Sequence, residues 1–237
     1  MLQKILNSVS LDKFLTTKKS VDLLKLEYNI RIAQTMGRAA SLRDSETESH
    51  NFRVSFLSAL LGQKLKLPQK QLQGLIKGAF LHDIGKIGIP DNILLKNGKL
   101  NEDEWKEMKL HPTLGKELIG DLPWFNDALD IILHHHEKFD GTGYPDGLKG
   151  DKIPLNARLF TVIDVFDALV SKRPYKEAMN MNEALKILKS EKDTHFDPKM
   201  LDLFCENISN LYEKVYTCSE NELRQLLMEN RKKIFGV

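Results

Sequence analysis

Histidine and acidic side chains recur along this chain in a pattern that suits metal-assisted hydrolysis. Five of the seven histidines fall in one series with carboxylates. The eight candidate metal ligands are Glu46, His50, His82, Asp83, His111, His135, His136 and Asp164. Imidazole and carboxylate together, without a thiolate, suit iron, manganese or zinc. Eight ligands are more than one ion can use, so the series predicts a multinuclear metallohydrolase.

The spacing of these residues predicts helices that could bring them together. Glu46 and His50 are four residues apart, so they would project from one face of one helix. His82 and Asp83 are adjacent at a predicted helix end, and consecutive helical residues point about 100° apart. One could therefore face a first ion while the carboxylate bridges to a second, and the pair at 135–136 could divide its contacts likewise. The core of a helical bundle is the natural place for such a site.

Each element alone has a simpler interpretation. A Glu–His pair four residues apart is most often a surface contact, and a single His-Asp dipeptide carries little information. His111 before a proline could be a helix cap, and residues 134–136 could form a solvated helix end. The metal interpretation depends on the whole ordered series.

Composition limits the classes of partner. The chain has 237 residues with 35 basic and 33 acidic side chains, a formal net charge of +2. This balance predicts no general attraction to nucleic acid polymers or to a membrane. Cys205 and Cys218 match no zinc spacing and favour a reducing compartment. No stretch approaches about 18 apolar residues and the N-terminus lacks a signal-peptide core, so we expect a soluble, cytoplasmic protein.

Apolar periodicity predicts an all-α, multi-helix bundle that encloses the metal site. The ranges expected to be helical are 20–41, 46–67, 69–83, 101–111, 113–120, 126–138, 156–171, 182–190, 198–213 and 220–233. Ser20 is expected to cap the first helix, and Pro68 to end the second. Asn101 and Glu104 form a near capping box. Residues 86–89 are the one short strand candidate.

Four motifs, taken in order, resemble the HD-GYP branch of the HD phosphohydrolases. They are HDIGK at 82–86, HHE at 135–137, GTGYP at 141–145 and DVFDAL at 164–169. Further matches lie at 43–47, 150–155, 173–176 and 194–198. The resemblance runs from about residue 38 to about residue 205. It implies hydrolysis of the bacterial second messenger cyclic di-GMP.

The resemblance implies a ligand set for each metal ion. A first ion would be held by His50, His82, Asp83 and Asp164. A second would use Asp83 as a bridge, together with His111, His135 and His136. Glu46 corresponds to a carboxylate that helps to hold a third ion in trinuclear members, although Glu48 stands where the family usually has glycine. The implied cofactors are two or three divalent ions, with iron or manganese expected.

The resemblance also implies roles beyond the ligands. Asp83 and Lys86 would be catalytic, with Lys86 contacting the scissile phosphate. Tyr144 would wall the substrate pocket, and Arg173 and Lys176 would bind a phosphate or a guanine. Asp167 is expected to support a ligand, and the extra histidine at 134 to be solvated or to play a supporting part.

The expected organisation is an N-terminal helical extension at 1–37 and an HD-GYP phosphohydrolase domain at 38–237. The helix that begins near residue 20 would serve as a dimerising or signal-coupling helix, or as a simple bundle helix. The leading functional hypothesis is cyclic di-GMP hydrolysis to pGpG or GMP. Open alternatives are another nucleotide such as cyclic GMP-AMP, a diiron oxygenase, and a non-catalytic metal-binding module that binds a partner such as a diguanylate cyclase.

Overall fold

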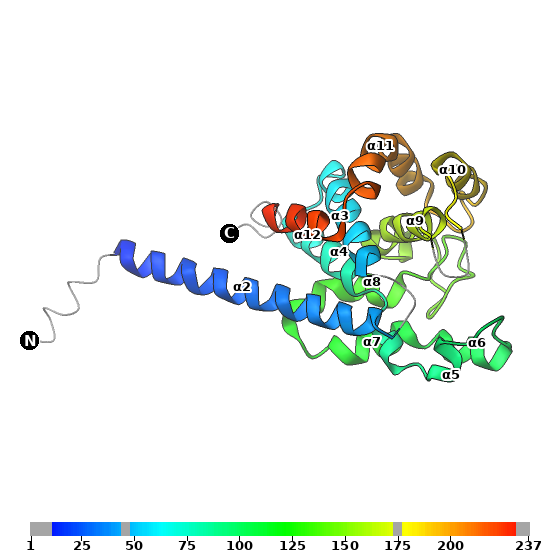
Figure 1. The fold of residues 1–237 in the computed structure, drawn as a ribbon, viewed down its shortest axis with the longest axis horizontal. Helices are drawn as coiled ribbons and strands as arrows, with labels where there is room; N and C mark the ends of the chain where they lie inside the picture. Colours follow the sequence, from blue (N-terminus) through cyan, green and yellow to red (C-terminus); the bar gives the residue numbers. More distant parts are fainter. Residues whose placement is uncertain (1–10, 44–47, 173–176, 231–237) are drawn as a thin grey trace, which may run out of the picture.

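The computed structural model describes residues 11–43, 48–172 and 177–230, and within these ranges the chain is helical without a β-strand. The predicted all-α class is therefore confirmed. The first helix, α2 (Leu11–Ser41), lies along one side of the bundle, and its N-terminal part extends beyond the other helices (Figure 1). None of the helices in the described ranges is both long enough and apolar enough to span a bilayer.

Thirteen further elements follow α2 along the described chain. They are α3 (Glu48–Lys64), α4 (Gln69–Leu81), η1 (Ile84–Gly88), α5 (Asp91–Leu94), α6 (Glu102–Met108), α7 (His111–Ile119), η2 (Pro123–Ala128), α8 (Leu129–His134), η3 (Gly150–Lys152), α9 (Leu155–Val170), α10 (Met181–Ser190), α11 (Pro198–Tyr216) and α12 (Glu220–Glu229).

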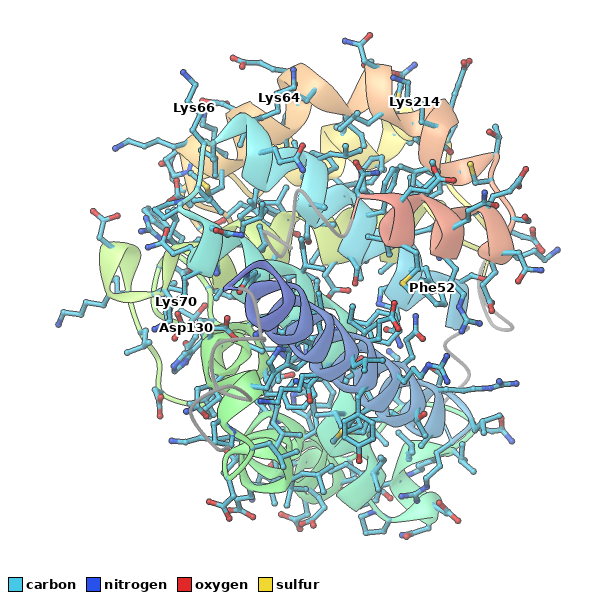
Figure 2. The ribbon with its side chains drawn as sticks, turned by 90° about the vertical axis from the view of Figure 1, so that its left-hand side faces the viewer. Phe52, Lys64, Lys66, Lys70, Asp130 and Lys214 are labelled. Carbon is cyan, nitrogen blue, oxygen red and sulfur yellow. The ribbon has the colours of Figure 1, made fainter. Side chains whose placement is uncertain are left out.

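Helices α3 and α4 form the centre of the bundle. Helix α3 packs against α4, α9, α11 and α12, while α4 also contacts α2, α8 and α9. The core between them includes fully buried phenylalanines at Phe52, Phe160, Phe166, Phe196 and Phe204. Exposed lysines such as Lys64, Lys66 and Lys214 lie at the periphery (Figure 2). Helices α3 and α9, and the end of α4, therefore hold the candidate metal ligands His50, Asp164 and His82 inside the bundle.

Several predicted boundaries are confirmed. Helices α9 and α10 each begin and end within one residue of the predicted ranges. The capping box of α6 is present. The Asn101 side chain accepts a hydrogen bond from the Glu104 backbone N–H, and the Glu104 side chain accepts one from the Asn101 backbone N–H. These local signals succeed because the atoms that decide them are neighbours in sequence.

Other boundaries are wrong. Helix α2 continues through Ser20, which is therefore not an N-cap. Helix α3 ends at Lys64 rather than near Pro68, because Lys66 takes a left-handed conformation with φ 54° and the Leu67 amide donates to the Gly62 carbonyl. Such a left-handed residue closes many helices. Residues 86–88 of the expected strand are instead part of the 3₁₀ helix η1, which begins at Ile84, and Ile89 follows it in an extended conformation.

The segments that carry His111 and the histidine pair also differ from expectation. His111 does not end a helix but opens α7, with Pro112 in its first turn, where a proline needs no amide partner. The single helix predicted at 126–138 is η2 followed by the short α8, so the histidine pair lies just beyond a helix end. Helix α12 ends at Glu229, and residues 231–233 of the predicted range lie outside the described residues.

Candidate metal centre

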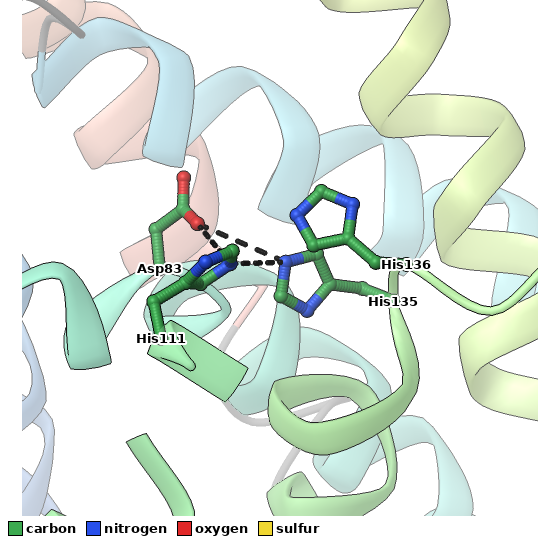
Figure 3. Close-up of side chains that lie close together, drawn as sticks. All are labelled: Asp83, His111, His135 and His136. Carbon is green, nitrogen blue, oxygen red and sulfur yellow. Dashed lines mark hydrogen bonds and ion pairs between the residues drawn. The ribbon is translucent and has the colours of Figure 1, made fainter. Parts of the chain in front are cut away.

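Asp83, His111, His135 and His136 converge on one point, although they come from three parts of the chain. Each offers one ligand atom, and these four atoms all lie within 4.8 Å of one another. Asp83 lies between α4 and η1, His111 opens α7, and the histidine pair follows α8. Figure 3 shows the Asp83 carboxylate directed at the rings of His111 and His135. The Asp83 Oδ1 atom lies 3.2 Å from His111 Nε2 and 3.7 Å from His135 Nε2.

His50, His82 and Asp164 form a second group next to the first. The His50 Nε2 atom lies 3.5 Å from His82 Nε2 and 3.5 Å from Asp164 Oδ1. The second oxygen of Asp83, Oδ2, lies 3.2 Å from His82 Nε2. Asp83 therefore faces one group with each of its carboxylate oxygens, which is the position expected of a bridging ligand.

The hydrogen bonds of the Nδ1 atoms fix the tautomers of four histidines. The Nδ1 atoms of His82, His111 and His135 lie 3.0, 2.9 and 3.0 Å from the backbone carbonyls of Ala79, Met108 and Ile131. A carbonyl can only accept, so each Nδ1 must donate its hydrogen. His50 Nδ1 lies 2.8 Å from Asp167 Oδ2 and donates in the same way. In the neutral rings each Nε2 then presents a lone pair to the interior, the form that binds a metal.

The Nε2 lone pairs face one another, and their arrangement shows whether metal ions fit between them. The Nε2 atoms of His111 and His135 are 3.3 Å apart. Lone pairs at that distance repel unless a cation lies between them. The Oδ1 atom of Asp83 is buried and accepts no hydrogen bond from the described residues. A buried carboxylate oxygen without a partner is costly, and a divalent ion would satisfy both it and the imidazoles, so the residues fit a metal centre.

Burial and charge set the protonation of the centre. Burial alone would raise the pKa of Asp83, but nearby groups, of which the Lys86 ammonium has the largest effect, lower that pKa well below its usual range. Burial lowers the pKa of His135 and lowers that of His136 strongly. The carboxylate is therefore ionised and these two imidazoles are neutral at pH 7, as metal ligation requires.

Asp167 supports His50 from behind, in line with the supporting role expected for it. Its carboxylate is fully buried and accepts from Arg53 Nε at 2.7 Å and from the Tyr216 hydroxyl at 2.9 Å, in addition to His50. Burial would raise its pKa, but the hydrogen bonds from Arg53 and His50 lower the pKa far more. The sequence patterns did not identify Arg53 and Tyr216 as site residues. Arg53 lies three residues after His50 on α3, so helical spacing could have suggested it.

Lys86 and Tyr144 lie beside the first group. Lys86 Nζ is 2.8 Å from Asp83 Oδ2. The Tyr144 ring stacks on His136 with a centroid distance of 4.7 Å and an interplanar angle of 24°. Both residues therefore lie next to the Asp83 group, and their roles toward a substrate stay predictions. Three other expected site residues, Glu46, Arg173 and Lys176, lie outside the described residues.

A close backbone approach brings Asp83 to His111. A Cβ built on Gly85 would lie 1.9 Å from the His111 carbonyl oxygen and 2.4 Å from the Gly115 nitrogen. Only glycine allows η1 and α7 to pack at this distance. The glycine of the HDIGK motif thus has a role in assembling the site.

Comparisons with known proteins identify a family and several relatives of this chain. A family model described as HD domain matches residues 34–200. The cyclic di-GMP phosphodiesterase response regulator RpfG of Xanthomonas campestris pv. campestris (strain 8004) is 46% identical over 169 residues, covering 70% of this chain and 45% of the relative. The 3'3'-cGAMP-specific phosphodiesterase 3 of Vibrio cholerae serotype O1 is 37% identical over 168 residues, covering 71% of this chain and 36% of the relative.

A solved structure shares the fold. The crystal structure of a cyclic GMP-AMP specific phosphodiesterase of V. cholerae superposes with a TM-score of 0.64 at 18% identity, covering 82% of this chain and 53% of that chain. The present chain spans less than half the length of the two curated relatives described above. The family match extends over most of the chain and includes every described metal-ligand candidate. The chain belongs to the HD domain family, and its motifs and relatives identify it as a member of the HD-GYP branch.

Proposed function

We propose that this chain is a metal-dependent phosphodiesterase that hydrolyses cyclic di-GMP to pGpG, GMP or both in bacterial signalling. The observation that carries the proposal is the Asp83 carboxylate, whose two oxygens face two groups of histidine nitrogens with their lone pairs inward. Support for the substrate comes from relatives named cyclic di-GMP phosphodiesterases, such as the regulator from X. campestris.

The proposed ligands are the residues of the two groups. His50, His82 and Asp164 would hold one ion, and His111, His135 and His136 a second, with Asp83 shared between them. Two ions at such a site polarise phosphoryl oxygens and lower the pKa of a bound water toward neutrality. Iron or manganese suits this nitrogen and oxygen ligand set. Glu46 would help to hold a third ion, and a third ion would favour the second cleavage to GMP.

The protein's own residues would orient the diester. Lys86 would donate to a non-bridging phosphate oxygen, where negative charge builds in the transition state. Tyr144 would form a wall of the pocket through its contact with His136. Arg173 would offer a planar pair of donors and Lys176 a point charge to the other phosphate or to a guanine edge.

A second substrate is also supported by a specific observation. The relative from V. cholerae that is named specific for 3'3'-cGAMP is 37% identical to this chain, not far below the cyclic di-GMP relative. Cyclic GMP-AMP shares the two phosphodiester bonds and one guanine with cyclic di-GMP, so the metal centre alone would not distinguish the two. The same domain could instead act as a non-catalytic metal-binding module, with no turnover of either.

The proposal extends to organisation and location. We assign residues 1–37 to a helical extension that couples the domain to a second copy or to a regulatory partner such as a diguanylate cyclase. Residues 38–237 would form the catalytic domain, working in the cytoplasm, where its substrate is made.

The test is product analysis after anaerobic reconstitution with iron(II) or manganese(II). Cyclic di-GMP and cyclic GMP-AMP are supplied in parallel, and the products are separated by chromatography, with Asp83→Ala as the control. We expect linear products that are absent in the control. No turnover of either substrate by protein with two ions bound would reject the enzyme and favour the binding module.

A further inference from the structure

A third group of possible ligands lies on the loop side of the histidine pair. His134, Glu137 and Asp146 each offer one atom, and these atoms lie within 4.8 Å of one another. His134 is the last residue of α8, and Asp146 directly follows the Tyr144-Pro145 pair. None of the three belongs to the ligand set proposed above.

His134 is not the solvated residue that its position at a helix end suggested. Its side chain is only 13% exposed, and its Nδ1 atom is buried and has no hydrogen-bond partner among the described residues. That atom lies 3.7 Å from Asp146 Oδ2 and 3.9 Å from Glu137 Oε1. Both distances are too long for a hydrogen bond. A buried ring nitrogen that lies within about 4 Å of two carboxylates, without a hydrogen bond to either, is an arrangement that a bound cation would satisfy.

Glu137 provides a second, independent observation. Its side chain is fully buried, yet the hydrogen bonds to its oxygens come from neutral donors, the amides of Asp146 at 2.8 Å and Leu148 at 3.0 Å. A buried carboxylate is costly without a countercharge. Each of its oxygens retains a further lone pair after accepting one hydrogen bond. Glu137 can therefore bind a cation without releasing the loop amides.

We propose that His134, Glu137 and Asp146 form a separate site for one divalent transition-metal ion. One imidazole and two carboxylates suit zinc, manganese or iron(II). Ligand bonds of about 2.1 Å in a tetrahedral zinc site separate the ligand atoms by about 3.4 Å. The distances of 3.7 and 3.9 Å therefore need only a small contraction. The Asp146 side chain is 54% exposed, which leaves a route for the ion and room for water as the fourth ligand.

An ion here would fasten the GTGYP loop to the end of α8. The loop returns to the helix at Asp146, two residues after Tyr144, and the Tyr144 ring stacks on His136. Occupancy of the third site would therefore hold that ring against a ligand of the main centre. This inference is independent of the substrate, because it concerns only the three side chains and the loop between them.

The alternative is a protonated His134 that neutralises the two carboxylates without any metal. Zinc content distinguishes the two accounts. The full chain is equilibrated with excess zinc, desalted and analysed for zinc per chain, and compared with His134→Gln and Asp146→Asn. Asp151→Asn is the matched control, because Asp151 is an exposed acid near the same loop that pairs with Arg158 instead.

We expect each of the two variants to bind one zinc fewer than the wild-type chain, and Asp151→Asn to bind the wild-type number. Equal zinc content in all four proteins would overturn the proposal in favour of the protonated histidine. Loss of more than one zinc would also overturn it, since the group would then not be separate from the main centre.

Amide hydrogen exchange shows whether a bound ion stabilises the loop, which the zinc content does not. Zinc should slow exchange at the Asp146 and Leu148 amides, which donate to Glu137. In the Asp146→Asn variant, zinc should not change the exchange rate of the Leu148 amide. Exchange that slows equally in both proteins would contradict the assignment, because the main centre alone would then account for the protection.

Discussion

Among single residues, Asp83 contacts candidate ligands of both groups. One oxygen faces His111 and His135, the other faces His82, and Lys86 lies 2.8 Å from the second. Without a metal ion, the first oxygen and the Nε2 lone pairs of His111 and His135 face one another and repel. The chemistry of the donors therefore argues for metal ions more strongly than any one distance does.

Lys86 should act on the transition state rather than on metal binding. We predict that Lys86→Met lowers kcat by about 10²- to 10³-fold, the usual effect of removing one donor to developing charge. The metal content should equal that of the wild-type chain, because Lys86 is not a ligand. Steady-state kinetics and metal analysis on the same sample check this. A variant that loses its metals would show that Lys86 acts by holding Asp83.

Asp167 should matter for both stability and metal affinity. Asp167→Asn removes the charge of the buried carboxylate that pairs with Arg53, and breaking a buried ion pair costs about 3–5 kcal/mol. It also weakens the acceptor of His50 Nδ1, and loss of such a support lowers metal affinity by about 10- to 100-fold. Chemical denaturation of the metal-free protein and metal titration measure the two effects.

Tyr216→Phe is the matched comparison for Asp167, because it removes only one hydrogen bond to the same carboxylate. It should cost about 1 kcal/mol of unfolding free energy and leave metal affinity nearly unchanged. Equal effects of the two variants on metal affinity would contradict the supporting role of the charge.

Among the individual residues, the sequence could indicate the candidate ligands and the supporting Asp167, but not the residues that bind Asp167. The HDIGK motif pointed to His82 and Asp83 and the spaced histidine series to His111, and in the structure Asp83 lies 3.2 Å from each of the two histidines. Arg53 and Tyr216 were not found, because their contact with Asp167 joins α3, α9 and α11. Helical spacing from His50 could have suggested Arg53, but no local pattern records the contact of Arg53 or of Tyr216 with Asp167.

At the scale of elements, the approach of η1 to α7 determines whether the first group forms. Gly85 is the contact point, since a Cβ there would meet the His111 carbonyl at 1.9 Å. The sequence suggested a strand at 86–89, because a short glycine-flanked apolar segment has no helical period. The 3₁₀ turn is set by packing on α7, which sequence periodicity does not report.

Gly85→Ala should therefore separate the two elements. We predict a loss of about 1–3 kcal/mol of unfolding free energy, as for other overpacked sites, together with weaker metal binding. Gly88→Ala is the control in the same short helix, where the nearest atom is the flexible end of Leu114 at 3.0 Å. Denaturation curves and metal titration compare them. An equal and small effect for both would remove Gly85 from the assembly of the site.

Local sequence signals are sufficient to predict some helix ends but not others. The capping box at Asn101 and the start of α10 at Asn180 follow from side chains that bond to nearby amides. The end of α8 was predicted four residues too late, because the histidines beyond it are held by the metal-site geometry and the loop at 141–148. Tertiary contacts decided that boundary.

At the scale of the whole molecule, the metal centre joins α3, α4, α7, α8 and α9. It gathers charged and polar groups at the middle of a bundle whose remaining core is apolar. Ions bound there would act as cross-links that exist only in the folded state. The stability of the molecule should therefore depend on metal occupancy.

Removal of metal should lower the thermal stability of the whole domain. A ligand present at about 1,000 times its Kd stabilises the folded state by about 4 kcal/mol. We predict a Tm that falls on chelation and recovers when manganese(II) is restored, followed by circular dichroism. Asp83→Asn should show a much smaller response to the chelator. An unchanged Tm in the wild-type chain would mean that the centre does not couple to folding.

The most direct test of a shared Asp83 is a crystal structure of the manganese-loaded chain, with the ions located by anomalous scattering. We expect two ions about 3.5–4 Å apart, with one Asp83 oxygen bound to each. A single ion, or two ions that Asp83 does not contact, would show that Asp83 is not shared.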